Sequence, residues 1–222
     1  MRYLILLGII LYNTVSFSQG LPFPGIAPPA SGSPFCHSVI SFDWSTTPQA
    51  DSTNFEMIKT TTNNFQVGGN LIWGAEGGDY EAARVKATYA NDQCAKAINT
   101  VNSGSGNDQV AMLVRAQNGA DTYYGCRIIS LSGVRITDII KTVAGSSSQL
   151  AVASDPADGD ELICYVTGSS PAVVNFYDIT TSTLLGTASD GMSPLTSGFV
   201  GVYAYGAGGG AKIGTMDTGD WF

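Results

Sequence analysis

The stretch DTYYGCRIISLSGVRITDIIKTV, residues 121–143, predicts a β-hairpin. Two segments rich in Ile, Val and Tyr flank Ser132 and Gly133, a pair that is typical of a tight turn. Asp121 and Thr122 form a polar turn before the first segment. Neither segment carries an obvious catalytic group, so the stretch indicates β structure without indicating a function. An enzyme, a sugar-binding surface and a structural shell are all compatible with it.

The rest of the chain repeats this pattern of short apolar segments and turns. Clusters such as QNGAD, AGSSS, DPADGD and TGSSP recur about every ten residues, which is typical of an antiparallel β sandwich. In residues 199–206, Tyr203 and Tyr205 fall on one face of the predicted strand, and Val200 and Val202 fall on the other. Helix-forming side chains gather only in residues 79–92, where a strand fits equally well.

The composition favours a large core with an uncharged polar surface. The 222 residues are 44% hydrophobic and only 13% charged, so Ser, Thr, Asn, Gln and Gly must make up much of the surface. The formal net charge is −8, and the ten Lys and Arg residues are spread along the chain without forming a patch. A nucleic-acid partner needs clustered positive charge, so we exclude one. The acidity is better explained by solubility than by binding.

The chain divides into three parts. Residues 1–19 begin with a positive charge at Arg2 and continue with an apolar run that is too short to span a membrane, which predicts an export signal. A buried or amphipathic N-terminal arm is the alternative. Residues 20–35 are rich in Pro and Gly and predict an extended linker or arm, and residues 36–222 form the domain. We expect no transmembrane segment and a secreted or cell-surface location, with a virion surface as the alternative.

Four cysteines, Cys36, Cys94, Cys126 and Cys164, are spaced too widely to suggest a metal site. In a secreted protein they can form disulfides, with three possible connectivities. Alternation places Cys126 and Cys164 on faces with apolar neighbours, so both are expected to point inward. We favour the pairs Cys126–Cys164 and Cys36–Cys94. Buried free thiols remain the alternative, because cysteine is often a small core residue.

Four stretches of the chain resemble a known family. They are YANDQCAKAINT, QVAMLVRAQNGADTYYGCRI, DPADGDELICYVTGSSPAVVNFYD and SGFVGVYAYG with AKIGTMDTGDW, which lie within residues 52–221. In the order of their strands and turns they resemble the laminin-G-like, concanavalin A-like jelly-roll domains of bacterial and phage surface proteins. The resemblance implies an all-β, antiparallel jelly-roll β sandwich. It contains no sharp catalytic motif.

Candidate catalytic groups are scarce. Some glycosidases of the resembled fold carry paired carboxylates on one strand, and no stretch of this chain has that pattern. His37 is the only histidine, and its neighbour Cys36 would point to the opposite face of a strand, so the two make no catalytic dyad. We therefore expect no enzyme activity, and a polysaccharide hydrolase or lyase is the least favoured alternative.

The densest acidic stretch is DPADGDE, residues 155–161. Asp155, Asp158 and Asp160 are candidate oxygen ligands for calcium, which is the only cofactor that the sequence suggests. The spacing is not that of an EF-hand loop. A turn that leads into a strand is the alternative reading.

Aromatic side chains are the best candidates for a binding site. Trp73, Tyr123, Tyr203 and Tyr205 lie on or near predicted strands, and such rings can stack on sugars. Tyr203 and Tyr205 share a face and predict an exposed, concave platform, with a role in the core as the alternative. We expect a non-catalytic module that recognises a glycan or a surface protein. The second hypothesis is a structural virion component whose proline-rich arm packs on copies of itself or on other virion proteins.

Overall fold

Antiparallel β-strands make up the described part of the chain, which contains fifteen strands and no helix. The computed structural model describes residues 36–48, 50–59, 65–74, 80–101, 107–206 and 210–221. The predicted leader (residues 1–19) and arm (residues 20–35) lie outside these ranges, so both remain predictions. Within the ranges described, no helix has the length and apolar character that crossing a membrane requires.

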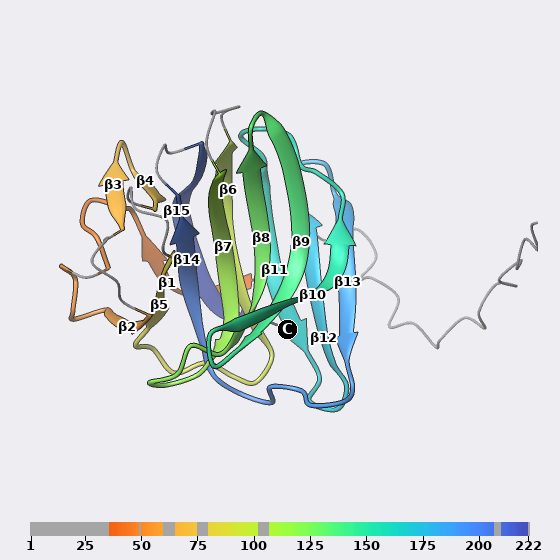
Figure 1. Cartoon of the computed structure of the whole chain (residues 1–222). Helices are drawn as coiled ribbons and strands as arrows, with labels where there is room; N and C mark the ends of the chain where they lie inside the picture. Colours follow the sequence, from red (N-terminus) through yellow and green to blue (C-terminus); the bar gives the residue numbers. More distant parts are fainter. Residues whose placement is uncertain are drawn as a thin grey trace, which may run out of the picture. The chain divides into compact units, whose positions relative to one another are not determined.

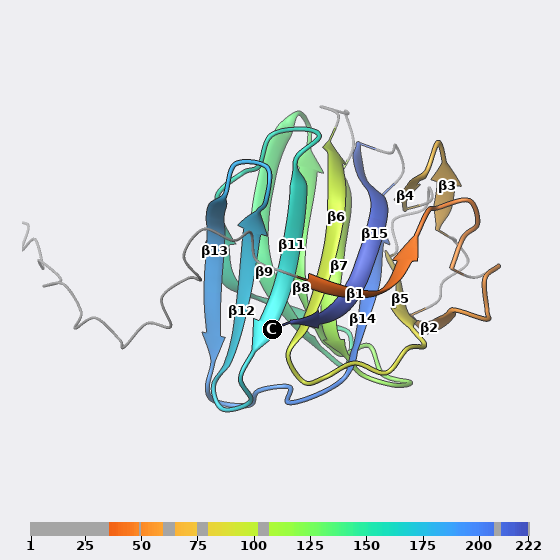
Figure 2. The ribbon, with the colours of Figure 1, turned by 180° about the vertical axis from the view of Figure 1, so that it is seen from behind.

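The strands form two sheets, which we call sheet A and sheet B. In spatial order, sheet A contains β13 (Thr183–Asp190), β12 (Ala172–Asp178), β11 (Glu161–Thr167), β6 (Gln93–Val101), β15 (Ala211–Trp221), β4 (Leu71–Trp73) and β3 (Gln66–Gly68), and β1 (Cys36–Phe42) also pairs with β15. Sheet B contains β10 (Ser146–Ala153), β9 (Val134–Val143), β8 (Tyr123–Leu131), β7 (Asn107–Ala116), β14 (Phe199–Tyr205), β5 (Tyr80–Val85) and β2 (Phe55–Lys59). Figure 1 shows sheet B in front, and Figure 2 shows sheet A from the other side.

This architecture is an antiparallel jelly-roll β sandwich, as the sequence predicted. The segment whose type was ambiguous, residues 79–92, contributes the strand β5, which pairs with β14 on one side and with β2 on the other. Strand pairing on both sides satisfies its backbone hydrogen bonds and outweighs the helix propensity of its residues.

Alternation along the strands builds the core between the sheets. Val110, Met112 and Val114 of β7 point inward and are almost fully buried, in one cluster with Leu162 and Val166 of β11. Burial of each such side chain stabilises the fold by about 1.5–3 kcal/mol. The side chains that point the opposite way from sheet B take no part in this core and form the outside of the sheet.

Two disulfides reinforce the sandwich. Cys126 of β8 and Cys164 of β11 both point inward, and their bond joins sheet B to sheet A through the core. Cys36 of β1 and Cys94 of β6 are bonded across β15, which lies between these two strands in sheet A. These are the pairs that the sequence analysis favoured over the other connectivities.

Candidate functional site

The outward side chains of sheet B line up in rows across neighbouring strands, because antiparallel register places residues of adjacent strands opposite one another. One row contains Ala82, Tyr203, Ala111, Arg127, Asp138 and Val152. The next row contains Tyr80, Tyr205, Gln109, Ile129 and Ile136. We call the surface that carries these rows the outer face.

A band of bonded polar side chains crosses the outer face. Arg127 binds Asp138 in a bidentate manner, with Nε 2.9 Å from Oδ1 and NH2 2.7 Å from Oδ2. The NH1 group of Arg127 and the hydroxyl of Tyr203 both donate to Oε1 of Gln109, at 3.0 and 3.2 Å. Gln149 donates to Oδ2 of Asp138 at 3.0 Å. We call Gln109, Arg127, Asp138 and Gln149 the polar band.

Within the polar band, the positive charge of Arg127 is balanced by the negative charge of Asp138. Burial opposes the charge of Arg127, but the hydrogen bonds and charge of Asp138 outweigh it and hold the pKa of the guanidinium above its ordinary value. Burial also raises the pKa of the Tyr203 hydroxyl to about 12. Tyr203 is therefore a neutral hydrogen-bonding group at physiological pH and not a base. Fixed, paired groups of this kind are suited to binding neutral polar ligands.

Three tyrosines lie beside the band. The ring of Tyr203 is 5.2 Å from that of Tyr80 and 6.5 Å from that of Tyr123, measured between centroids. Glycine at position 125 of the same face leaves room for its neighbours, since a Cβ there would lie 3.2 Å from a methyl of Leu113. Tyr123 is fully buried, and burial raises the pKa of its hydroxyl well above the ordinary value.

A loop covers this tyrosine cluster. The side chain of Tyr80 on β5 donates to Oδ2 of Asp121, at 2.5 Å, in the loop that precedes β8. Three strand spacings, roughly 14 Å, separate β5 from β8 within the sheet. The loop therefore extends from the end of β8 toward β5 on the side of the outer face. We call residues 117–122 the strap.

Further contacts fix both ends of the strap. Oδ1 of Asn118 accepts a hydrogen bond from NH2 of Arg84 on β5, at 3.0 Å. At the other end, the turn between β9 and β10 pairs with the strap, since Gly145 N donates to Asp121 O at 2.9 Å and Ala144 N donates to the hydroxyl of Thr122 at 3.0 Å. The strap is thus tied both to β5 and to the turn between β9 and β10.

The structure corrects the predicted aromatic platform. Tyr203 and Tyr205 do share the outer face, but only 6% of Tyr203 is exposed, so it offers no free ring surface. Tyr123 lies on the same face and is fully buried, whereas Tyr205 is half-buried and reaches solvent. Trp73 belongs to a different surface. Its neighbour in β4, Ile72, points into the core, so Trp73 lies on the outside of sheet A.

The predicted calcium ligands are engaged in holding a turn. Oδ1 of Asp155 accepts the hydroxyl of Thr137 at 2.6 Å, and Oδ2 of Asp160 accepts the amide of Ala157 at 2.6 Å. Asp158 is exposed. Among the residues that the structure describes, no three acidic, His or Cys side chains are grouped to hold a metal ion. The geometry favours the turn that the sequence analysis gave as the alternative.

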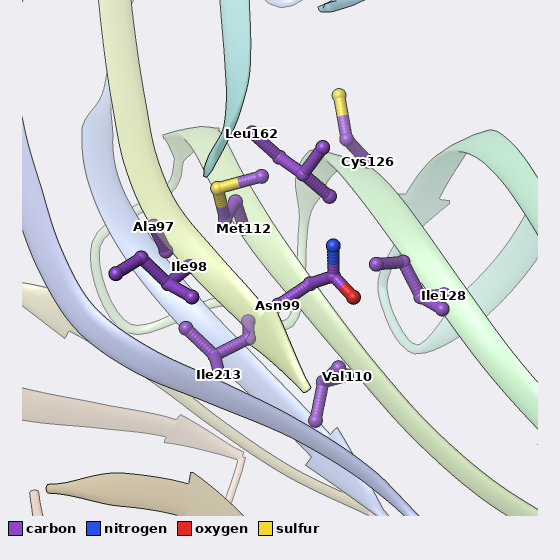
Figure 3. A pocket seen from close by; sticks show the side chains of 9 residues that line it. All are labelled: Ala97, Ile98, Asn99, Val110, Met112, Cys126, Ile128, Leu162 and Ile213. Carbon is purple, nitrogen blue, oxygen red and sulfur yellow. The ribbon is translucent and has the colours of Figure 1, made fainter. Parts of the chain in front are cut away.

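A small cavity lies inside the sandwich and not on the outer face. Met112, Cys126, Leu162 and Ile213 contribute to its apolar lining, and Asn99 is the polar member (Figure 3). It has room for about one water molecule. A cavity of this size cannot hold a sugar, so the outer face remains the better candidate for a binding site.

The polar band was missed by the sequence analysis. Alternation along β8 places Arg127 on the face opposite to Cys126, and this placement could have been predicted from the sequence. Its partners Gln109 and Asp138 come from β7 and β9, and Gln149, which binds Asp138, comes from β10. Their alignment depends on strand register, which the sequence does not state.

No protein-family model matches the sequence, and no curated protein matches it. Solved structures match the fold. A carbohydrate-binding module, CBM66, from Bacillus subtilis has a TM-score of 0.52 and 15% identity, with 76% of this chain and 93% of that one covered. The CBM2 module of the evolved Dit protein of Lactobacillus casei BL23 phage J-1 has a TM-score of 0.55 and 9% identity, with 82% and 94% covered.

An enzyme shares the fold as well. The glycoside hydrolase family 16 endo-glucanase from Bacteroides ovatus has a TM-score of 0.50 and 9% identity, with 81% of this chain and 99% of that one covered. At these identities the likeness establishes the β sandwich and nothing about the ligand. Binding modules and an enzyme occur among the matches, so the function has to be argued from the residues of the outer face.

Proposed function

We propose that this protein is a non-catalytic carbohydrate-recognition module that binds a glycan on the outer face of sheet B. The observation that carries the proposal is the polar band, in which an amide, a guanidinium and a carboxylate are fixed side by side next to aromatic rings. Sugars present hydroxyl groups at their edges and C–H groups on their faces. A fixed polar band with adjoining apolar side chains complements both features.

The part of the outer face that reaches solvent is the end beyond the strap. Tyr205, Gln109 and Ile129 lie in one row there and are half-buried, and Ile136 at the end of that row is exposed. Gln109 uses its carbonyl oxygen for Arg127 and Tyr203, and its Nε2 donates one hydrogen to Oδ1 of Asn107 at 3.3 Å, so the second amide hydrogen is the donor proposed for the ligand. Tyr205 supplies a ring, and Ile129 with Ile136 supplies an apolar flank. We call this end the open subsite.

The test is binding to an immobilised glycan array, followed by affinity electrophoresis with the glycans that bind. Gln109→Ala and Tyr205→Ala are each expected to weaken binding by about tenfold, the effect of losing one hydrogen bond or one ring contact. Tyr177→Ala is the matched control, because Tyr177 is a half-buried tyrosine on sheet A. Equal losses in all three variants, or no bound glycan on a broad array, would contradict the proposal.

A polysaccharide hydrolase or lyase is the competing proposal, and the fold is compatible with it. The pairing of Asp138 favours the binding module, because a carboxylate held by two bonds from Arg127 is poorly placed to transfer a proton. Incubation with a polysaccharide panel distinguishes the two. Release of reducing ends or of unsaturated products would replace the present proposal with an enzymatic one.

The proposed location is outside the cell. Two disulfides in a domain of this size are typical of proteins that fold in an oxidising compartment. The same binding chemistry would also serve a protein on a virion surface. Mass spectrometry of culture medium, cell envelope and purified particles separates these locations, and the N-terminal peptide found in each fraction reports whether the leader is removed.

A further inference from the structure

We propose that the outer face holds a second, covered sugar subsite on Tyr123 and Tyr203, and that the strap controls access to it by lifting. This inference rests on the proposed function, and it adds a subsite and a moving part to it. The covered subsite would extend the open subsite along the same face, so that a longer glycan chain could occupy both.

The floor beneath the strap has the chemistry of a sugar subsite. Tyr123, Leu113 and Ile140 point away from the core, yet each is at most 1% exposed. Together with Tyr203 they form an apolar, aromatic cluster separate from the core between the sheets. Rings of this kind stack on the C–H faces of pyranoses. The hydroxyl of Tyr203 bonds to Gln109, so the covered floor is continuous with the polar band.

The strap covers this floor without packing large apolar side chains into it. Its sequence is QNGADT, in which Ala120 is the only apolar side chain, and Asn118 and Gly119 are exposed. Hydrogen bonds hold it instead, from Tyr80, Gly145 and Ala144 at one end, from Arg84 to Asn118, and from Gln117 to the carbonyl of Ser197. Segments with little buried apolar surface are the ones that open at low free energy.

The closed strap also leaves buried polar atoms without partners. Oδ1 of Asp121 and Nε of Arg84 are both inaccessible to solvent and lack a hydrogen bond. Each is part of a side chain that holds the strap. An unsatisfied buried polar group destabilises the state that buries it, and opening would return both atoms to water. The closed state is therefore weakened at two of the contacts that maintain it.

The hydrogen bond between Tyr80 and Asp121 provides the test, because it can be removed with one atom. Tyr80→Phe keeps the ring beside Tyr203 and deletes the hydroxyl, which lies 2.5 Å from Oδ2 of Asp121 and 3.3 Å from the carbonyl oxygen of Gly145. Amide hydrogen exchange in residues 117–122 and hydroxyl-radical labelling of Tyr123 and Tyr203 are measured by mass spectrometry on the full chain. Both are expected to rise by about tenfold, the effect of losing a hydrogen bond to a charged group.

Two further variants keep the test decisive. Tyr177→Phe, the same change on sheet A, should alter neither readout. Asp121→Ala removes the same hydrogen bond from the other side and should reproduce the effect of Tyr80→Phe, with unfolding midpoints measured to show that each variant is folded. Unchanged exchange and labelling in both folded variants would overturn the strap as a movable cover.

Ligand protection separates this inference from the proposed function. Cellohexaose, laminarihexaose and mannohexaose are the probes, and one that binds is expected to protect Tyr123 from labelling in Tyr80→Phe. An oligosaccharide that binds in a Gln109-dependent manner without protecting Tyr123 would overturn the covered subsite and leave the proposed function standing. If none of the probes or arrayed glycans binds, the covered subsite fails together with the proposed function, whereas exchange and labelling still decide whether the strap moves.

Discussion

Nζ of Lys141 on β9 lies 2.6 Å from Oδ2 of Asp190 at the end of β13, and this buried ion pair joins sheet B to sheet A. The same carboxylate oxygen accepts the hydroxyl of Tyr124 at 2.7 Å, and Lys141 also donates to the carbonyl and hydroxyl of Ser193. All three donor hydrogens of the ammonium group are thereby used. The arrangement closes one edge of the sandwich with polar bonds.

Replacement of Lys141 should be strongly destabilising. Lys141→Met leaves the buried carboxylate of Asp190 without its cation and is expected to lower the free energy of unfolding by about 3–5 kcal/mol. Urea unfolding followed by tyrosine fluorescence measures the change. Lys96→Met is the control, since Lys96 pairs with Glu161 and Asp217 on the partly exposed outside of sheet A and should lose only about 0–1 kcal/mol. Equal losses in both variants would contradict the role given to burial.

Asp190 also predicts a dependence of stability on pH. Burial opposes its charge, but the hydrogen bonds from Lys141 and Tyr124 outweigh burial and hold the pKa of its carboxyl below the ordinary 3.8. A carboxyl whose pKa is lower in the folded state stabilises the fold above its unfolded pKa. That stabilisation is complete at neutral pH and is lost as the pH falls below about 3.8. Unfolding midpoints of the wild type and Asp190→Asn should therefore differ at pH 7 and converge in acid, and a constant difference would count against this assignment.

The positive charge of Arg115 is not enough to explain its contribution to stability, because the shape of its guanidinium is also used. It is fully buried at the end of β7, and its guanidinium donates to the carbonyls of Asn91 at 3.0 Å, of Leu195 at 2.6 Å and of Gly168. These carbonyls belong to three different loops. Arg115→Lys keeps the charge but cannot reach all three, so we expect a loss of about 2–3 kcal/mol in urea unfolding.

The matched variant for Arg115 is Arg135→Lys. Arg135 is half-buried and donates to the carbonyl of Pro156. A loss below about 1 kcal/mol is expected there, because the shorter side chain remains partly hydrated. If the Arg115→Lys variant were as stable as the wild type, other contacts would have to hold the three loops.

The two disulfides should contribute similar amounts to the stability of the protein, but each should stabilise a different part of it. Removing Cys126 and Cys164 together as alanines is expected to lower the free energy of unfolding by about 2–5 kcal/mol, and removing Cys36 and Cys94 by a similar amount. Hydrogen exchange distinguishes them. Loss of the first pair should raise exchange in β8 and β11, and loss of the second in β1 and β6.

Features that depend on a single strand could be predicted from the sequence. Alternation alone separated Tyr203 and Tyr205 from Val200 and Val202, and it turned Cys126 and Cys164 inward, which made their pairing plausible. Turn residues such as Ser132 and Gly133 marked the hairpin, and the structure has positive φ angles at both positions, 48° and 83°. Local side-chain direction and turn chemistry are encoded over a few residues, so they need no knowledge of neighbours.

Features that depend on several strands could not be predicted. Tyr203 has the right face for a platform, but Tyr80, Tyr123 and the strap cover it, and these come from β5, β8 and the loop before β8. Arg127 meets Asp138 only through the register of β8 with β9. A shift of one residue in this pairing would have placed the two side chains on opposite faces of the sheet, and nothing within either strand reports the register.

The pairing of β1 with β15 has a consequence for how the domain can be carried by a longer polypeptide. Cys36 stands opposite Trp221 in register, so the backbone enters the sandwich beside the point at which it leaves. A domain with adjacent entry and exit points can be spliced into a surface loop of a host protein without forcing that loop apart. For the same reason its ends can be fused and new ones opened elsewhere, and the exposed turn at Ser132 and Gly133 is a suitable position for the new ends.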